Sequence, residues 1–421
     1  MSKAEHYQAV LDRYQSDRRL PSVVAGVLDG PELSWSGSAG APTTTDTQYR
    51  IGSITKVMTA VLVMQCRDDG LLDLDDRIGR HVPETGYADA TVRSLLAHVS
   101  GMQSEPVGPW WERSPGVSVE TLLAANDGSG AVFAPGEQWH YSNLGFGLLG
   151  ETVARLRGAP WFDLVEQRIL EPLGMTRTSY LPEEPYARGL SVHHLANTLT
   201  PEPLQDTGAM APAGQLWSTV EDLARFGAFL SLGNPPVLAD QTLTEMREAV
   251  PPAIDYGLGI RLVPYAGGVL SGHTGSMPGF QATLFVDPLA HLGVVALTNA
   301  TTGFSGSELA LALLGDHTPT PVAPWQPTET LPEWARELLG YWHWGNTAFE
   351  VRWQGEQLEF RDLSMGGVVE EQFELRGDRI VGVAGYHHGE TLHVVRREDG
   401  SIDHLECATF VYTREPYPDG P

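Results

Sequence analysis

Residues 53–68 begin with Ser53-Ile54-Thr55-Lys56 and continue VMTAVLVMQCRD. Its apolar residues would lie on nearly every side of a helix, which is typical of a buried helix, and Gly70 follows where such a helix would end. Ser53 and Lys56 are three residues apart at the start of this helix, so their side chains share one face. An amine one turn along can therefore reach the hydroxyl.

The Ser53–Lys56 pair has the properties that nucleophilic catalysis requires. Free N–H groups at the helix start favour a negative charge developing beside Ser53. Burial drives a lysine toward its neutral form, which is the form a general base needs. Lys3 and Lys56 are the only lysines among 27 basic residues, and arginine cannot release a proton in this way. The alternative is that Ser53 only caps the helix and Lys56 is a surface charge.

Two further motifs carry groups suited to the same chemistry. Tyr141 can relay a proton and the amide of Asn143 can bind an acyl carbonyl when both project from one short turn, Tyr141-Ser142-Asn143. In His273-Thr274-Gly275-Ser276, Gly275 lets a ligand approach the backbone of a predicted strand closely. Taken alone, each motif is also consistent with a turn or a strand end.

In the order Ser-x-x-Lys, Tyr-x-Asn, His-x-Gly, these motifs resemble the family of class C β-lactamases, D-alanyl-D-alanine carboxypeptidases, D-aminopeptidases and related esterases. The segments LLAHVSG at 95–101 and PAGQLWST at 212–219 support the resemblance, which spans about residues 5–315. It implies an antiparallel sheet flanked by helices, with an acyl-enzyme formed during catalysis.

The resemblance also implies a role for each residue of the motifs. Ser53 would be acylated, with Lys56 and Tyr141 as general base and acid and with Asn143 positioning the substrate. His273 and Gly275 would lie on the strand that lines the site, and the backbone N–H groups of Ser53 and Ser276 would form the oxyanion hole. β-Lactamases of this kind carry Lys-Thr-Gly where this chain has His273-Thr274-Gly275, so the sequence favours a peptidase or esterase over a strong β-lactamase.

The order of predicted elements indicates an α+β fold with two domains. Strands near both ends of residues 1–316, at Ser22–Asp29, Glu32–Gly37, Tyr256–Val263, Val269–Gly272, Gln281–Val286 and Leu292–Leu297, are expected to form one sheet around an inserted helical region. Prolines crowd residues 317–332, which predicts a linker. Residues 333–421 contain six short alternating runs and are expected to form a small antiparallel barrel or sandwich, lipocalin-like by resemblance, that shapes substrate access.

Composition excludes several classes of partner. The formal charge of −26 disfavours nucleic acid and anionic membranes, and no apolar run reaches the length of a membrane span. Cys66 and Cys407 predict no disulfide framework, and with the polar N-terminus they favour the cytoplasm. No cofactor and no metal are expected, because the His193-His194 and His387-His388 pairs have no His-Glu-x-x-His motif or Cys partner.

Several weaker signals receive structural interpretations. Gly145–Gly150 matches the dinucleotide fingerprint but follows a turn rather than a strand, so we expect its small residues to allow close helix packing. His98 is expected to satisfy backbone groups at a helix end. Trp110 and Trp111, in a Pro/Gly loop, are consistent with either core packing or a wall of the substrate pocket, and we favour the wall.

We therefore predict a serine hydrolase that acts on a small amide, peptide or ester through Ser53. One alternative is acyl transfer to an amine, as in the penicillin-binding-protein-type thioesterases that cyclise nonribosomal peptides and that resemble this chain in having a lipocalin-like C-terminal domain. Another is a catalytically silent binding protein, which would be expected to have lost Ser53, Lys56 or Tyr141. The sequence is compatible with water or an amine as acyl acceptor and leaves the oligomeric state open.

Overall fold

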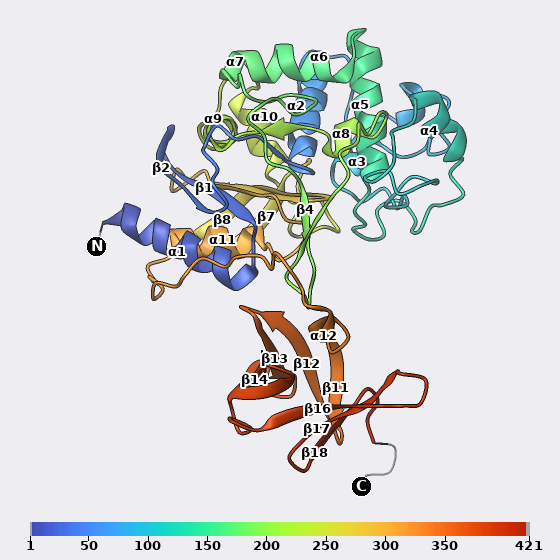
Figure 1. Cartoon of the computed structure of the whole chain (residues 1–421). Helices are drawn as coiled ribbons and strands as arrows, with labels where there is room; N and C mark the ends of the chain where they lie inside the picture. The colour runs from blue at the N-terminus through green and yellow to red at the C-terminus, as the bar shows by residue number, and fades with distance from the viewer. Residues whose placement is uncertain (1, 418–421) are drawn as a thin grey trace. The chain divides into compact units, whose positions relative to one another are not determined.

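The computed structural model describes residues 2–417, which form two compact units (Figure 1). The first unit comprises the chain up to Ser191 together with Pro201–Gln326, and the second comprises Val192–Thr200 and the chain from Pro327 onward. The placement of residues 192–200 differs from the sequence expectation, which left them in the first domain. These residues bind a strand of the second unit: Trp353 N–H donates to the Leu195 carbonyl at 2.8 Å, and Asn197 Nδ2 donates to the Trp353 carbonyl at 2.7 Å.

The first unit is built on one six-stranded antiparallel sheet with the order β2-β1-β10-β9-β8-β7. Its strands are β1 Ser22–Asp29, β2 Glu32–Gly40, β7 Arg261–Tyr265, β8 Gly268–Met277, β9 Phe280–Asp287 and β10 Leu292–Thr298. Because β1 pairs with β10, the two ends of the unit meet in one sheet, which confirms the α+β prediction. The expected strand at 256–263 was wrong at its start, because β7 begins only at Arg261 and Tyr256 lies before it.

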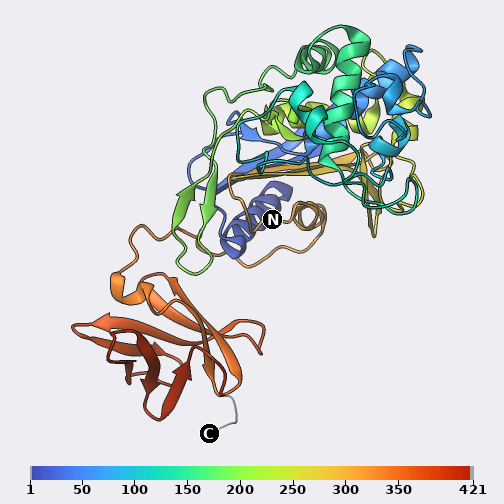
Figure 2. The same cartoon turned by 90° about the vertical axis from the view of Figure 1, so that its right-hand side faces the viewer.

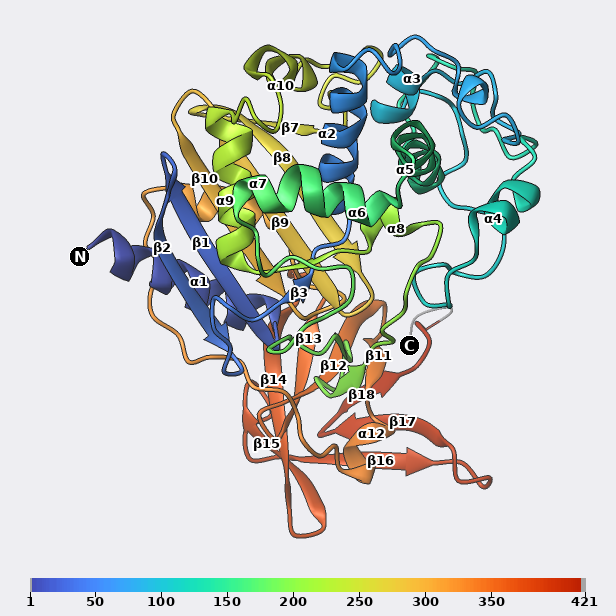
Figure 3. The ribbon, with the colours of Figure 1, turned by 90° about the horizontal axis from the view of Figure 1, so that it is seen from above.

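Helices cover both faces of this sheet. Helices α1 (Lys3–Arg18) and α11 (Gly306–Leu314) lie side by side on one face, where Leu11 and Leu309 pack with Phe285 (Figure 2). Helices α2 (Ile54–Asp68) and α9 (Val220–Leu232) lie over the other face (Figure 3). Both faces therefore exclude water, which explains why the central strands are buried along most of their length.

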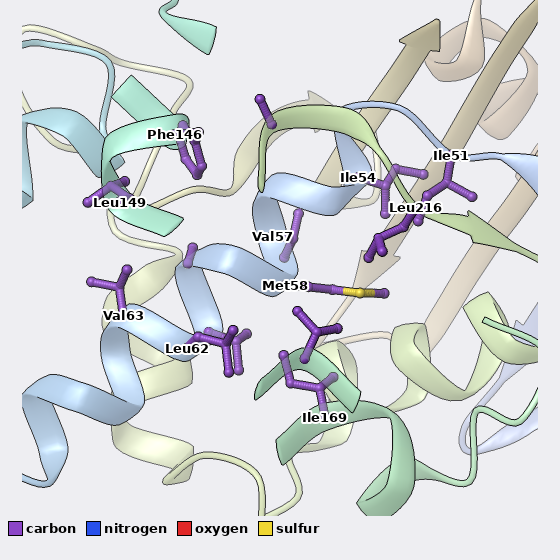
Figure 4. Close-up of a cluster of buried hydrophobic side chains, with 14 of the residues drawn as sticks. Ile51, Ile54, Val57, Met58, Leu62, Val63, Phe146, Leu149, Ile169 and Leu216 are labelled. Carbon is purple, nitrogen blue, oxygen red and sulfur yellow. The ribbon is translucent and has the colours of Figure 1, made fainter. Parts of the chain in front are cut away.

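The helix that carries the Ser-x-x-Lys motif is buried from Ile54 to Cys66. Figure 4 shows Val57, Met58, Leu62 and Val63 of α2 surrounded by apolar side chains that come from separate segments of the chain, among them Ile51, Phe146, Leu149, Ile169 and Leu216. Tight packing on all sides fixes the position of the helix and therefore of the residues at its first turn.

Further helices fill the inserted region between β2 and β7. They are α3 Val92–Leu96, α4 Val119–Ala125, α5 Asn143–Arg157, α6 Trp161–Val165, α7 Glu171–Leu173, α8 Ala211–Gly214 and α10 Asp240–Met246, and single helical turns lie at 78–80 and 166–170. Two small two-stranded sheets accompany them. One pairs β3 Tyr49–Arg50 with β6 Trp217–Ser218, and the other pairs β4 Leu190–Val192 with β5 Leu199–Pro201. A Cβ on Gly150 of α5 would lie 2.1 Å from Cγ of Pro212 in α8. The expected close packing of the glycine-rich segment is thus confirmed.

The second unit is a closed antiparallel barrel of eight strands. Of the two expected architectures, the barrel is therefore correct and the sandwich is wrong. Its elements are α12 Glu333–Arg336, β11 Gly340–Trp344, β12 Thr347–Gln354, β13 Gln357–Asp362, β14 Val368–Arg376, β15 Arg379–Ala384, β16 Thr391–Arg396, β17 Ile402–Cys407 and β18 Phe410–Thr413. Sequence patterning did not indicate β11 or β17 as separate strands.

The proline-rich segment before the barrel is partly fixed to the first unit. Trp325 is buried there, and its backbone N–H and carbonyl are bound by the side chain of Gln15 at 3.0 Å each. None of the helices in the described residues combines the length and the apolar character needed to cross a membrane.

Candidate active site

Ser53 stands at the N-terminal end of α2 in a helical backbone conformation, with φ −65° and ψ −5°. Its side chain makes no capping hydrogen bond with the first turn of the helix. The hydroxyl oxygen instead accepts a hydrogen bond from Lys56 Nζ at 3.0 Å. The helix-cap interpretation of Ser53 therefore fails, and the hydroxyl is available to the lysine.

Lys56 is completely buried, which rules out the alternative interpretation that it is only a surface charge. Nζ also donates to the Ala213 carbonyl oxygen at 2.6 Å, and it lies 5.0 Å from the centre of the Tyr141 ring. Burial lowers the pKa of Lys56 to about 7, although the negative charges of Glu105 and Glu112 act in the opposite direction. A lysine with such a pKa is partly neutral near pH 7 and can accept a proton from Ser53.

Tyr141 completes a group of three side chains around the Ser53 hydroxyl. Its phenol is hydrogen-bonded to Ser53, and burial raises the pKa of Tyr141 above its ordinary value. The phenol therefore keeps its proton at neutral pH and can donate it to a leaving group.

His98 holds the turn that presents Tyr141. Its Nδ1 accepts the backbone N–H of Ser142 at 3.0 Å, its carbonyl accepts the N–H of His140 at 2.7 Å, and its ring centre lies 4.1 Å from that of Tyr141. Burial holds the pKa of His98 well below its usual range, so the ring is neutral and Nδ1 is an acceptor. The expected backbone role of His98 is correct, but the backbone that it binds belongs to the Tyr-Ser-Asn turn.

Strand β8 passes very close to the chain that leads into α2. A Cβ on Gly275 would lie 1.8 Å from the Ile51 carbonyl oxygen and 3.1 Å from the backbone nitrogen of Ser53. A Cβ on Gly52 would lie 2.5 Å from the backbone nitrogen of Ser276. Glycine at 275 thus allows the strand itself to approach Ser53, whereas the sequence suggested that it made room for a ligand.

His273 is buried on the same strand and is held between two oxygens. Nδ1 donates to the Thr274 carbonyl at 2.5 Å, which leaves Nε2 to accept from the Tyr256 hydroxyl at 2.9 Å. Burial lowers the pKa of His273 to about 3. The imidazole is therefore neutral at physiological pH and cannot attract a substrate carboxylate as a lysine would.

Asn143 is the first residue of α5 and is bound to an acidic side chain that sequence reasoning missed. Its Nδ2 donates to Glu105 Oε1 at 2.7 Å, and Trp111 Nε1 donates to Glu105 Oε2 at 2.6 Å. Nearby, Glu112 accepts from Trp110 Nε1 at 2.8 Å, and burial raises the pKa of Glu112. The negative charges of both Glu105 and Glu112 act on Lys56 and favour its protonated form.

A cavity of about 450 Å³ opens beside Ser53. Five of the seven site residues expected from the sequence line it, namely Ser53, Tyr141, His273, Gly275 and Ser276. Lys56 and Asn143 are not among the lining residues. The cavity is also lined by residues that were not predicted as site residues from the sequence, among them Trp139, Tyr256, Arg261, Gln281 and Phe304.

The two tryptophans expected to form a pocket wall do not line this cavity. Trp111 is buried in the main hydrophobic core, and Trp110 is largely exposed with its ring 4.6 Å from the Arg113 guanidinium. The favoured wall interpretation is therefore wrong for this cavity, and Trp111 follows the core alternative, with its indole hydrogen-bonded to Glu105.

Comparison with known proteins agrees with this geometry. The family model described as Beta-lactamase matches residues 7–316, and a model of a domain of unknown function, DUF7586, matches residues 331–414. The chain is 29% identical over 373 residues to penicillin-binding protein 4 of Amycolatopsis lactamdurans, which covers 80% of this chain and 96% of that protein.

Solved structures show the same fold. The octameric penicillin-binding protein homologue from Pyrococcus abyssi aligns with a TM-score of 0.67 and 23% identity over 97% of this chain and 99% of its own. A D-stereospecific amidohydrolase from Streptomyces sp. aligns with a TM-score of 0.61 and 27% identity over 72% of this chain and 95% of its own. The chain therefore belongs to the β-lactamase family and is a serine hydrolase of that family.

Proposed function

We propose that the protein hydrolyses small amides, peptides or esters through an acyl-enzyme on Ser53. The observation that carries the proposal is the buried Lys56, whose Nζ is hydrogen-bonded to Ser53 Oγ and whose pKa is near neutrality. Neutral Lys56 takes the hydroxyl proton as Oγ forms a bond to the substrate carbonyl carbon, and the carbonyl π electrons move to its oxygen. The backbone N–H groups of Ser53 and Ser276 stabilise this oxyanion.

The tetrahedral intermediate then collapses with loss of the leaving group. Tyr141 donates its phenolic proton to the departing nitrogen or oxygen, and the proton held by Lys56 replaces it. Water then attacks the ester on Ser53 by the same steps in reverse, which returns the hydroxyl to Ser53 and releases a carboxylic acid.

The acyl part of the substrate is proposed to carry a free ammonium group. Glu105 is bound to Asn143, the residue proposed to position the acyl carbonyl, and Glu112 adds a second carboxylate in the same region. A cation favours such a site and an anion is repelled by it. The D-stereospecific amidohydrolase activity named for the Streptomyces protein further supports an amide of D configuration.

The experiment compares D-phenylalanine amide with its N-acetyl derivative and with L-phenylalanine amide. We expect kcat/KM to be highest for the free D-amine and to fall by about tenfold or more on acetylation. Glu112→Gln should remove most of this preference, whereas Glu120→Gln, an exposed acid on α4, should leave it intact. Equal rates for free and acetylated substrates would contradict the ammonium preference, and no hydrolysis of amides or activated esters would contradict the proposed reaction.

A further inference from the structure

The barrel brings together a histidine, a glutamate and a cysteine that are separated in the sequence. A ring nitrogen of His387, a carboxylate oxygen of Glu390 and Sγ of Cys407 all lie within 4.8 Å of one another. The strand register explains the meeting: Cys407 at the end of β17 pairs with Leu392, two residues after Glu390. Sequence reasoning saw His387 without a cysteine partner, and the fold supplies one.

The imidazole of His387 is fully buried and only half satisfied. Nδ1 is 2.5 Å from Glu390 Oε2, whereas Nε2 is shielded from solvent and has no hydrogen-bond partner in the described part of the chain. The Phe410 ring meets the imidazole edge-on at 4.7 Å and holds its orientation. Nδ1 is therefore the nitrogen that could share an ion with Glu390, because the two ring nitrogens point away from each other and an ion at Nε2 would lie far from that carboxylate.

The loop that carries His387 is fixed by a further carboxylate. Glu371 on β14 is buried and accepts the backbone N–H groups of Tyr386 at 3.2 Å and of His387 at 3.1 Å. A Cβ on Gly385, at φ +92°, would lie 2.4 Å from the same carboxylate. The backbone is therefore held so that His387 faces inward before any ion binds.

A second carboxylate lies beside the cluster. Cys407 is buried with Sγ within 4.8 Å of a Glu390 carboxylate oxygen, and the buried Glu371 carboxylate binds the backbone N–H of His387. A cation bound among these groups would offset the negative charge of the two carboxylates.

We propose that His387, Glu390 and Cys407 form a zinc site in the barrel. Imidazole, carboxylate and thiolate are ligand types that zinc binds tetrahedrally, and water would complete the coordination. On binding, the Cys407 thiol gives its proton to solvent and the thiolate sulfur bonds to the metal. The ion would join the loop between β15 and β16 to the end of β17. Calcium and magnesium do not suit a thiolate ligand.

Cobalt(II) is the probe, because a thiolate ligand gives cobalt a near-ultraviolet charge-transfer band. The full chain, freed of metal with a chelator that is then removed, is titrated with cobalt chloride and afterwards with zinc chloride. We expect a band that saturates at one equivalent and that zinc abolishes. The chain has only two cysteines, so Cys66→Ser should keep the band and Cys407→Ser should lose it.

A second pair of variants separates lost binding from lost folding. Glu390 has a half-exposed side chain, so Glu390→Gln should fold and should bind zinc about tenfold or more weakly in competition with a chromophoric chelator. Glu398→Gln, an exposed acid between β16 and β17, is the matched control and should bind as the unchanged protein does. Absence of the band at one equivalent, or its persistence in Cys407→Ser, would overturn the proposal.

Discussion

Lys56 Nζ lies 3.0 Å from Ser53 Oγ in a position that water does not reach. The short distance follows from the i, i+3 spacing on α2, and the dry environment follows from the packing of α2 on all sides. Together they give an amine that is both near its proton donor and able to be neutral.

Lys56→Arg should abolish most of the activity although it keeps the positive charge. The guanidinium cannot release a proton at working pH, so we expect kcat/KM for a small activated ester to fall by about 10²–10⁴-fold. Lys3→Arg, on the exposed N-terminal turn, is the control and should be unchanged. A Lys56→Arg enzyme that retained a tenth or more of the rate would make Lys56 an electrostatic anchor rather than a base.

The pH dependence should report Lys56. Since the neutral amine is the active form and the pKa is about 7, kcat/KM should rise about tenfold per pH unit below that value and level off above it. His273, with a pKa near 3, titrates outside this range and should add no inflection between pH 5 and 9. A profile that is flat from pH 5 to 9 would contradict the lysine assignment.

Lys56→Met should inactivate the enzyme and stabilise its fold near pH 6. A folded-state pKa of about 7 against an ordinary value of 10.5 means that the unfolded chain binds the proton more tightly. The resulting destabilisation is complete below pH 7, on the order of 4–5 kcal/mol, and disappears above about pH 10.5.

Methionine also leaves the Ala213 carbonyl without its partner, so the expected net gain in the free energy of unfolding is about 2 kcal/mol at pH 6. Denaturant unfolding at pH 6 and pH 10 measures it. The gain should vanish at the higher pH, and a gain that did not change with pH would show that burial of the charge is not its cause.

Two glycines on α5 should respond in opposite ways to alanine. In Gly150→Ala the new Cβ would meet Pro212 Cγ at 2.1 Å, and because a proline ring cannot move aside easily we expect a loss of about 1–3 kcal/mol. In Gly145→Ala the nearest atom is 3.4 Å away, so a gain of up to about 1 kcal/mol is expected from helix propensity. Thermal or denaturant unfolding of the two variants measures both changes in the free energy of unfolding. Equal changes in the two variants would argue against close packing of α5 on α8.

Local patterns predicted the parts of the site that depend on local geometry. The Ser53–Lys56 pair lies within one helical turn, and the predicted strands at 281–286 and 292–297 correspond to β9 and β10. The partners that tune these groups were not predictable in the same way. Ala213 binds Lys56 and Glu105 binds Asn143 through contacts between distant segments, and no periodic pattern marks either residue.

The errors have the same origin. The sequence pattern predicts Tyr256 as the first residue of a strand, but its hydroxyl is hydrogen-bonded to His273 and the strand begins only at Arg261. Residues 192–200 carry no sign that they bind β12 of the second unit, because the hydrogen bonds to Trp353 use mainly backbone groups. Cys407 meets His387 because β17 pairs with β16, the strand that follows the loop carrying His387, and the sequence does not reveal this pairing.

Covalent labelling of the full chain with a fluorophosphonate tests the central claim most directly. Intact mass followed by peptide mapping should show one adduct per chain, on Ser53, because Lys56 activates that hydroxyl. Ser53→Ala should take up none, and Lys56→Arg should be labelled far more slowly. An adduct mapped to another residue, or equal labelling of Ser53→Ala, would contradict the assignment of Ser53 as the nucleophile.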